Sequence, residues 1–147
     1  KRIFYFCLAF ISILMGSAIY ILFRPTTLLM FHWFYSMGLM RSIINLRNEM
    51  NGFNRSLPSW FIYSLPFALY VISYLFFIKG IWWNSTSLVR HVWFWCIPIV
   101  AVGSELGQSF YFIPGYFDMT DLITILLGTA FVVLITEHPK PNKREIA

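Results

Sequence analysis

An almost unbroken apolar run from Ile3 to Phe23 constrains the fold of this chain more than any other feature. Lys1 and Arg2 precede the run and Arg24 follows it, so charge is confined to its two ends. About 20 consecutive apolar residues in a helix match the hydrocarbon core of a bilayer. The run is too long for a cleaved signal peptide and has no clear small-residue cleavage site at its end, so we expect a membrane-spanning helix.

The composition extends this expectation to the rest of the chain. Hydrophobic residues make up 59% of the 147 residues and charged residues only 12%, whereas soluble domains usually carry about 25% charged residues. Aromatic residues make up 20%, which suits a small protein in contact with the lipid interface. The basic residues are scattered near the ends of apolar segments, which argues against a nucleic-acid partner.

Three further apolar segments complete the expected architecture. The sequence predicts an all-α, integral membrane four-helix bundle that forms a single domain over residues 1–147. Pro66 and Pro98 fall inside the second and third segments, where proline kinks or interrupts a helix. The expected helices cover residues 3–23, 58–78, 89–112 and 120–135, and a polar, mobile tail covers residues 137–147.

The long link between the first two helices predicts an amphipathic helix lying flat in the membrane interface, over about residues 30–50. Apolar side chains recur there at helical spacing and polar side chains share another face. The apolar set is Trp33, Met37, Met40 and Ile44, and the polar set is Arg41, Asn45 and Asn48. A re-entrant or spanning segment over residues 28–40 is the alternative, which the charges of Arg41 and Arg47 disfavour.

The distribution of Lys and Arg predicts the orientation in the membrane. One side would hold both termini and the link after the second helix, with Lys1, Arg2, Lys79, Arg90, Lys140, Lys143 and Arg144. The other side would hold Arg24, Arg41, Arg47 and Arg55. Because basic residues concentrate on the cytoplasmic side, we expect both termini in the cytoplasm and the link between the third and fourth helices facing outward.

Three of the six acidic residues, Glu105, Asp118 and Asp121, lie close together around that outward-facing link. A charged side chain at the centre of a bilayer costs roughly 2.5–3.5 kcal/mol on insertion scales. Charge at such a position therefore indicates a functional site. We expect the binding site of the protein to lie in this region.

Helical spacing assigns faces to the third helix. Glu105 and Gln108 are three positions apart and share one face. Gly103 and Gly107 fall on roughly the opposite face, where small residues allow a neighbouring helix to approach closely. The third helix would thus present a carboxylate–amide pair to one partner and glycines to another.

On the fourth helix, Asp121, Thr124 and Gly128 form one stripe. The simplest assembly turns Asp121 and Thr124 toward Glu105 and Gln108. The candidate ligand-binding residues are therefore Glu105, Gln108, Asp118, Asp121 and Thr124, and the candidate helix-packing residues are Gly103, Gly107 and Gly128.

A purely structural role is the alternative for these acidic residues. Asp121 in the first turn of a helix is stabilised by the helix dipole, and Asp118 or Thr120 can cap the same helix. Glu105 can hydrogen-bond to Gln108 and join two helices.

As a binding site, the cluster can accept hydrogen bonds from an amine or hydroxyl-rich headgroup, or bind a hard cation through oxygen. Arg24, Arg41 and Arg55 on the same side can contact phosphate, although anchoring in the interface is the simpler role for each.

The remaining chemically active residues predict neither a metal site nor a cofactor. His32 and His91 lie at opposite membrane edges and His138 in the tail, so none joins the carboxylates in a zinc or Ser-His-Asp arrangement. Cys7 and Cys96 fall inside apolar segments, where we expect small buried thiols and no disulfide.

The cluster resembles the signature of the VanZ-like membrane proteins. The resemblance covers about residues 103–129 and rests on Glu105-x-x-Gln108, Pro114, Asp118, Asp121 and Gly128. It implies a small bacterial membrane protein of four or five helices. Some members are linked to resistance to glycopeptide antibiotics, notably teicoplanin, and their biochemical activity is poorly defined.

Two departures from the family pattern affect what the resemblance implies. Gly115 or Tyr116 stands where the family usually has an arginine, and Thr124 stands where it usually has an asparagine. The missing arginine removes a partner for Asp118 or a group for binding phosphate. The ligand of this chain can therefore differ from that of the family.

Together these features predict a non-catalytic protein of the bacterial inner membrane. Its outward-facing polar pocket would engage an envelope lipid, a lipid-linked precursor or a lipophilic glycopeptide antibiotic. The alternatives are a structural subunit, with a homo-oligomer as one form, and an oligomeric channel-forming effector of a defence or toxin system. A hydrolase or transferase ranks last because no nucleophile is paired with a base.

Overall fold

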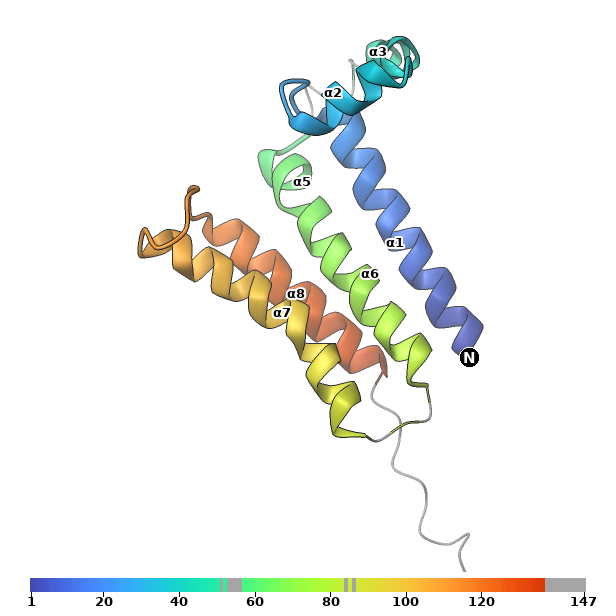
Figure 1. Ribbon diagram of the computed structural model, residues 1–147, viewed down its shortest axis with the longest axis vertical. Helices are drawn as coiled ribbons and strands as arrows, with labels where there is room; N and C mark the ends of the chain where they lie inside the picture. The colour runs from blue at the N-terminus through green and yellow to red at the C-terminus, as the bar shows by residue number, and fades with distance from the viewer. Residues whose placement is uncertain (51, 53–56, 84, 86, 137–147) are drawn as a thin grey trace, which may run out of the picture.

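The computed structural model describes residues 1–50, 52, 57–83, 85 and 87–136, and all regular structure in these ranges is helical, as expected. The predicted tail over residues 137–147 lies outside them. The helices are α1 (Arg2–Phe23), α2 (Leu29–Ser36), α3 (Met40–Glu49), α5 (Ser59–Tyr63), α6 (Leu65–Ile81), α7 (Leu88–Ser109) and α8 (Met119–Thr136) (Figure 1).

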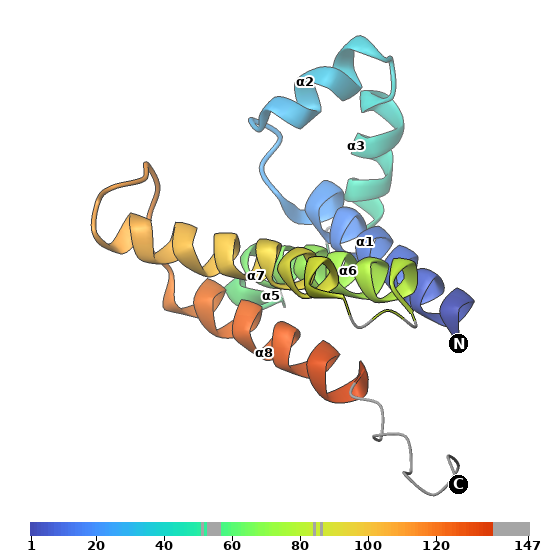
Figure 2. The ribbon, with the colours of Figure 1, turned by 60° about the horizontal axis from the view of Figure 1, so that its bottom comes forward.

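Helix α6 is the helix on which the others pack. It contacts α1, α5, α7 and α8, whereas α1 and α7 have no extensive contact with each other. Figure 2 shows α1, α6 and α7 as one layer, with α8 on one side of it and α2 and α3 projecting on the other. The buried core follows from this arrangement, because Val71, Leu75 and Phe76 of α6 meet Ala9 of α1 and Ile125 of α8.

A glycine and a serine bring α1 close to α6. A Cβ atom on Gly16 would lie 3.1 Å from Cε1 of Tyr70, so any side chain there would require α6 or Tyr70 to shift. About two turns away along α1, Ser73 Oγ donates a buried hydrogen bond of 2.8 Å to the carbonyl of Ala9. The small residues that the sequence offers on α1 therefore serve the contact with α6.

Two arginines satisfy carbonyl groups near the ends of helices, which lack partners within their own helix. Arg24 Nη2 donates to the carbonyl of Tyr63 at the end of α5, at 3.0 Å. Arg47 of α3 donates to the carbonyls of Ile21 and Arg24, at 2.8 and 2.7 Å, and lies over the ring of the buried Phe31. These bonds attach α3 to the end of α1.

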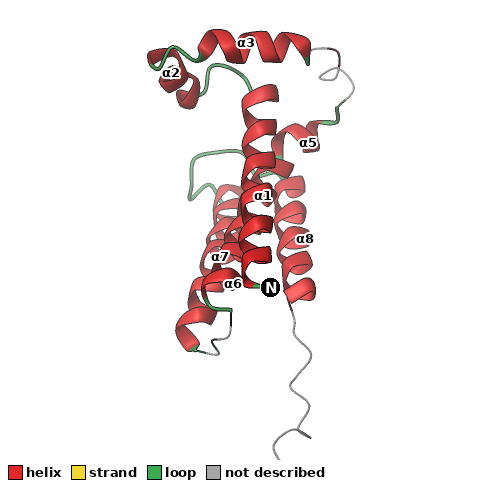
Figure 3. Cartoon of the chain, turned by 90° about the vertical axis from the view of Figure 1, so that its right-hand side faces the viewer, coloured by secondary structure: helices red, strands yellow, loops and turns green. Residues whose placement is uncertain are grey.

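The single interfacial helix predicted over residues 30–50 is wrong, because two helices occupy that stretch. Gly38 has φ +73 and lies between α2 and α3, where a left-handed residue ends a helix. Both helices lie across the end of α1 (Figure 3). The alternative of a spanning segment is also excluded, since α2 has only 8 residues.

The second predicted helix is divided at Ser64 into α5 and α6. Pro66 explains the break, because it has no N–H to donate to the preceding turn and restricts the residue before it. The predicted interruption at Pro98 does not occur, since α7 continues through that residue.

Helix α7 ends at Ser109, before the predicted residue 112. Tyr111 has a left-handed φ of 59, and the amide of Phe112 donates to the carbonyl of Gly107 at 2.8 Å. This is a Schellman end in which a tyrosine occupies the position that glycine usually takes. Helix α8 lies within one residue of the predicted 120–135 at each end.

The glycines of α7 do not have their predicted role, because neither Gly103 nor Gly107 seats a neighbouring helix among the described residues. No atom of these residues lies within 4 Å of a Cβ atom placed on Gly103, and Gly107 contacts Ile113 of the following loop. Gly128 of α8 does lie against another helix, since its Cβ atom would be 3.1 Å from Ile72 of α6.

These contacts predict different effects of leucine at two glycines. Gly16→Leu forces α1 away from α6, and overpacking of this kind costs about 1–3 kcal/mol. Gly103→Leu meets open space and leaves stability unchanged. Thermal unfolding of both variants in the same detergent measures the difference, and equal unfolding midpoints would contradict the α1–α6 contact.

Candidate functional site

A cavity of about 290 Å³ lies where the C-terminal ends of α1 and α7 meet the N-terminal end of α8. Its polar lining consists of Arg24, Ser104, Glu105, Gln108 and Asp121. We call it the polar pocket. Tyrosines complete the wall, namely Tyr20 of α1, Tyr63 of α5 and Tyr70 of α6. The pocket therefore joins residues that are far apart in the sequence.

Glu105 is the most deeply placed charged group of the polar pocket. The residue is only 5% exposed, and its Oε2 atom is buried without a hydrogen-bond partner. A buried polar atom left unbonded costs about 1–3 kcal/mol, and more if charged. The backbone of Asp118 hydrogen-bonds to this carboxylate, and the charges of Asp121 and Asp118 also act on it. Three acidic groups thus influence one another at this end of the bundle.

Two more groups of the polar pocket have unbonded buried atoms, the Oδ1 atom of Asp121 and the Nε atom of Arg24. The guanidinium of Arg24 lies over the rings of Tyr20 and Tyr63, at 5.1 and 4.7 Å from their centres. Cation–π contacts and its bond to the Tyr63 carbonyl hold the group in place but leave Nε without an acceptor. The pocket therefore presents unbonded atoms of both charges.

Gln108 is held against the loop that follows α7. Gly115 has φ +143, which L side chains rarely adopt, and its Cβ atom would lie 2.7 Å from Nε2 of Gln108. The glycine therefore lets the backbone pass directly over the amide. Gln108 forms the part of the pocket wall next to this loop.

The other two predicted site residues serve α8 itself. The carboxylate of Asp118 accepts a 2.8 Å hydrogen bond from the amide of Thr120, as an N-cap does. Thr124 donates its hydroxyl hydrogen to the carbonyl of Asp121, at 3.0 Å. Neither lines the polar pocket, so the structure gathers Glu105, Gln108 and Asp121 from the predicted set.

Ser104 and the tyrosines were not among the residues predicted to form the site. Arg24 was expected at the same membrane edge, but with no feature that separated it from Arg41 and Arg55. The sequence signal that could have identified Arg24 was its position directly after the first apolar run, because the end of a rigid helix determines the position of the Cα atom of the next residue. No comparable signal marks the tyrosines.

The described part of the chain holds no group of three His, Cys, Asp or Glu residues that could bind a metal ion. Cys7 and Cys96 are free and exposed, so the expectation that both thiols are buried is wrong. They face outward because their helices bury only the sides turned toward the bundle. The polar pocket, with donors and acceptors but no histidine, is suited to binding.

Comparisons with protein-family models, curated proteins and solved structures find no match to this chain. The chemistry of the polar pocket is therefore interpreted from its own residues. It combines one cation, two carboxylates and an amide in a cavity large enough for a small headgroup.

The hydrogen bond from the Thr120 amide to the Asp118 carboxylate predicts that Asp118 contributes to stability by capping α8. Asp118→Ala removes the acceptor for the Thr120 amide and lowers the free energy of unfolding by about 1 kcal/mol, whereas Asp118→Asn keeps a capping oxygen and most of the stability. Chemical or thermal unfolding of both variants checks this. Equal losses in the two would show that charge, and not capping, is the contribution of Asp118.

Proposed function

We propose that this chain is an integral membrane protein in which α1, α5 with α6, α7 and α8 cross a bilayer. Two helices of the described residues, Arg2–Phe23 and Met119–Thr136, are long and apolar enough to do so. Only 17% and 28% of the most apolar 18-residue stretches of these two helices are buried within the structure, whereas the core helices of soluble proteins are mostly buried. Large apolar side chains cover their outer surfaces, as at Phe10, Leu14 and Leu127, which are 63%, 51% and 65% exposed.

The proposed orientation puts both termini in the cytoplasm of a bacterium and the polar pocket at the outer face of the inner membrane. The balance of Lys and Arg supports it. Trp33 and Met37, 59% and 68% exposed on the α2–α3 segment across the end of α1, suit the outer interface. The resemblance of the residues around Glu105 to the VanZ-like signature supports a bacterial membrane protein.

The polar pocket, in this proposal, binds the headgroup of an envelope lipid or lipid-linked precursor without catalysis. The observation that carries this is the set of unbonded buried atoms in Arg24, Glu105 and Asp121. A purely structural cluster would bond these atoms across the helices. A ligand that bonds all three needs donors for the carboxylates and an acceptor for the guanidinium, and groups of opposite charge form the strongest such bonds. Ammonium and phosphate in one zwitterionic headgroup meet both requirements.

Neutralising the carboxylates tests this function. Glu105→Gln and Asp121→Asn each remove a charge-assisted hydrogen bond, worth about 1.5–3 kcal/mol. We expect the affinity of the detergent-solubilised protein for phosphatidylethanolamine to fall about tenfold or more in each. Native mass spectrometry of lipid-bound protein measures this affinity, with phosphatidylglycerol as the comparison lipid.

Glu49→Gln is the matched control, because Glu49 is an exposed acidic residue of α3 outside the pocket. It should leave both affinities unchanged. If the pocket variants lower the unfolding midpoint but bind lipid as the wild type does, the cluster is structural and the proposed function is wrong.

A further inference from the structure

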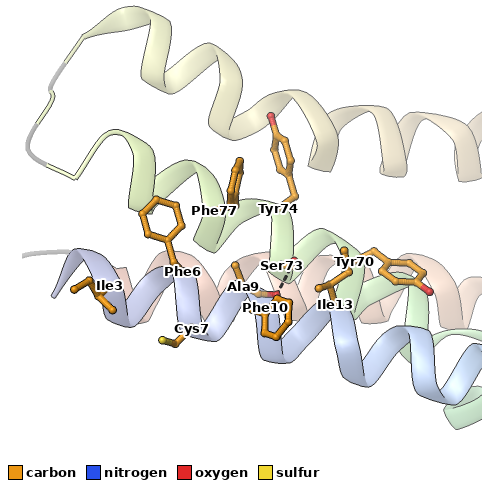
Figure 4. Close-up of a pocket in the computed structure, with 10 residues that line it drawn as sticks. All are labelled: Ile3, Phe6, Cys7, Ala9, Phe10, Ile13, Tyr70, Ser73, Tyr74 and Phe77. Atoms are coloured by element: carbon orange, nitrogen blue, oxygen red, sulfur yellow. Dashed lines mark hydrogen bonds between the residues drawn. The ribbon is translucent and has the colours of Figure 1, made fainter.

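A second and larger cavity, of about 710 Å³, lies beside the polar pocket. Figure 4 shows it between α1 and α6, with α7 beyond and α8 behind. We call it the apolar groove. Its lining includes Phe6, Cys7, Phe10 and Ile13 of α1 and Ser73 and Phe77 of α6.

Two of the few polar groups of the apolar groove, the hydroxyls of Ser73 and Tyr74, donate hydrogen bonds within the protein. Ser73 donates its hydroxyl hydrogen to the carbonyl of Ala9, and the hydroxyl of Tyr74 donates to the carbonyl of Trp93 in α7. These bonds use the hydrogens of the two hydroxyls, so neither donates to a ligand in this arrangement. What remains accessible is suited to hydrocarbon.

The apolar groove and the polar pocket are consecutive along one face of α6. Tyr70, Ser73, Tyr74 and Phe77 are spaced as i, i+3, i+4 and i+7, so they share a face. Pro66, one turn before Tyr70, lies in the polar pocket, and Tyr70 lines both cavities. The surface is therefore polar at one end and apolar over the rest.

The length of this face fits one leaflet of a membrane. From residue 66 to residue 77 is eleven steps along α6, or about 16 Å at a rise of 1.5 Å per residue. The hydrocarbon core of a bilayer is about 30 Å thick, so each leaflet contributes about 15 Å. Because the α5–α6 segment begins at Ser59, a chain whose headgroup occupied the polar pocket would run beside α6 past the middle of the bilayer.

We infer that the ligand is an amphiphile with its zwitterionic headgroup in the polar pocket and one hydrocarbon chain in the apolar groove. This inference rests on the proposed function and adds where the chain lies. The charges of Arg24, Glu105 and Asp121 select the headgroup. The groove begins at Tyr70, where the pocket ends, and receives the chain.

Photo-crosslinking locates the chain directly. The wild-type protein is placed in phosphatidylglycerol vesicles with a trace of phosphatidylethanolamine carrying a diazirine at mid-chain, and adducts are mapped by mass spectrometry. We expect adducts at Cys7, Phe10 and Ile13 to exceed those at the exposed Leu127 and Phe131 of α8 at least fivefold. A phosphatidylglycerol probe with the same diazirine should label both regions alike.

Two results would overturn the inference. Uniform labelling of α1 and α8 by the phosphatidylethanolamine probe would show an ordinary lipid shell. Absence of adducts from the groove, as a second copy of the chain covering it would produce, would show another occupant.

Either result leaves the proposed function standing if Glu105→Gln still weakens binding of the headgroup. Unchanged binding in that variant would refute the function itself.

A pair of cysteine variants checks the groove by filling it. Cys7 is exposed and lines the groove, so Cys7→Trp fills space without overpacking the core, whereas Cys96 is exposed on α7 and does not line it. We expect Cys7→Trp to lower the phosphatidylethanolamine adducts in the groove several-fold and Cys96→Trp to leave them unchanged. Equal labelling in both variants would contradict a chain bound there.

Discussion

The packing of α1 and α7 on α6, without extensive contact between the two, determines the rest of this structure. Gly16 and Ser73 fix α1 at close range, and the hydroxyl of Tyr74 joins α6 to α7 through the carbonyl of Trp93. Because α8 covers only one side of this layer, a face of α6 stays open on the other (Figures 2 and 4). The apolar groove lies along that face, and the polar pocket lies at its end, where Asp121 of α8 completes the wall.

The polar end of this face holds opposite charges that are not satisfied by one another. Arg24 is positioned by the Tyr63 carbonyl and two aromatic rings, and Glu105 is buried in the wall formed by α7. A membrane protein that needed polar contacts only to hold its helices together would lose less by bonding these groups directly. The unbonded atoms therefore favour a ligand that supplies charge of both signs.

Much of this organisation follows from local sequence, and the remainder does not. The helix over residues 3–23 and a cap at the start of α8 were predictable, because each depends on residues that are close together in the sequence. Helical spacing correctly separated Glu105 from Gly103, but it cannot say which face meets another helix, so the packing role of Gly103 was wrong. The left-handed Tyr111 was also unpredictable, because an ordinary side chain there gives no signal of a helix end.

The most direct test of a bound zwitterionic amphiphile is to identify the molecule that co-purifies with the protein. The full chain is purified in a mild detergent and analysed by native mass spectrometry, with the bound molecule released and fragmented. We expect the purified protein to retain one amphiphile per chain, and this molecule to carry both an amine and a phosphate. A chain that retains no amphiphile, or that retains only anionic lipids, would contradict this expectation.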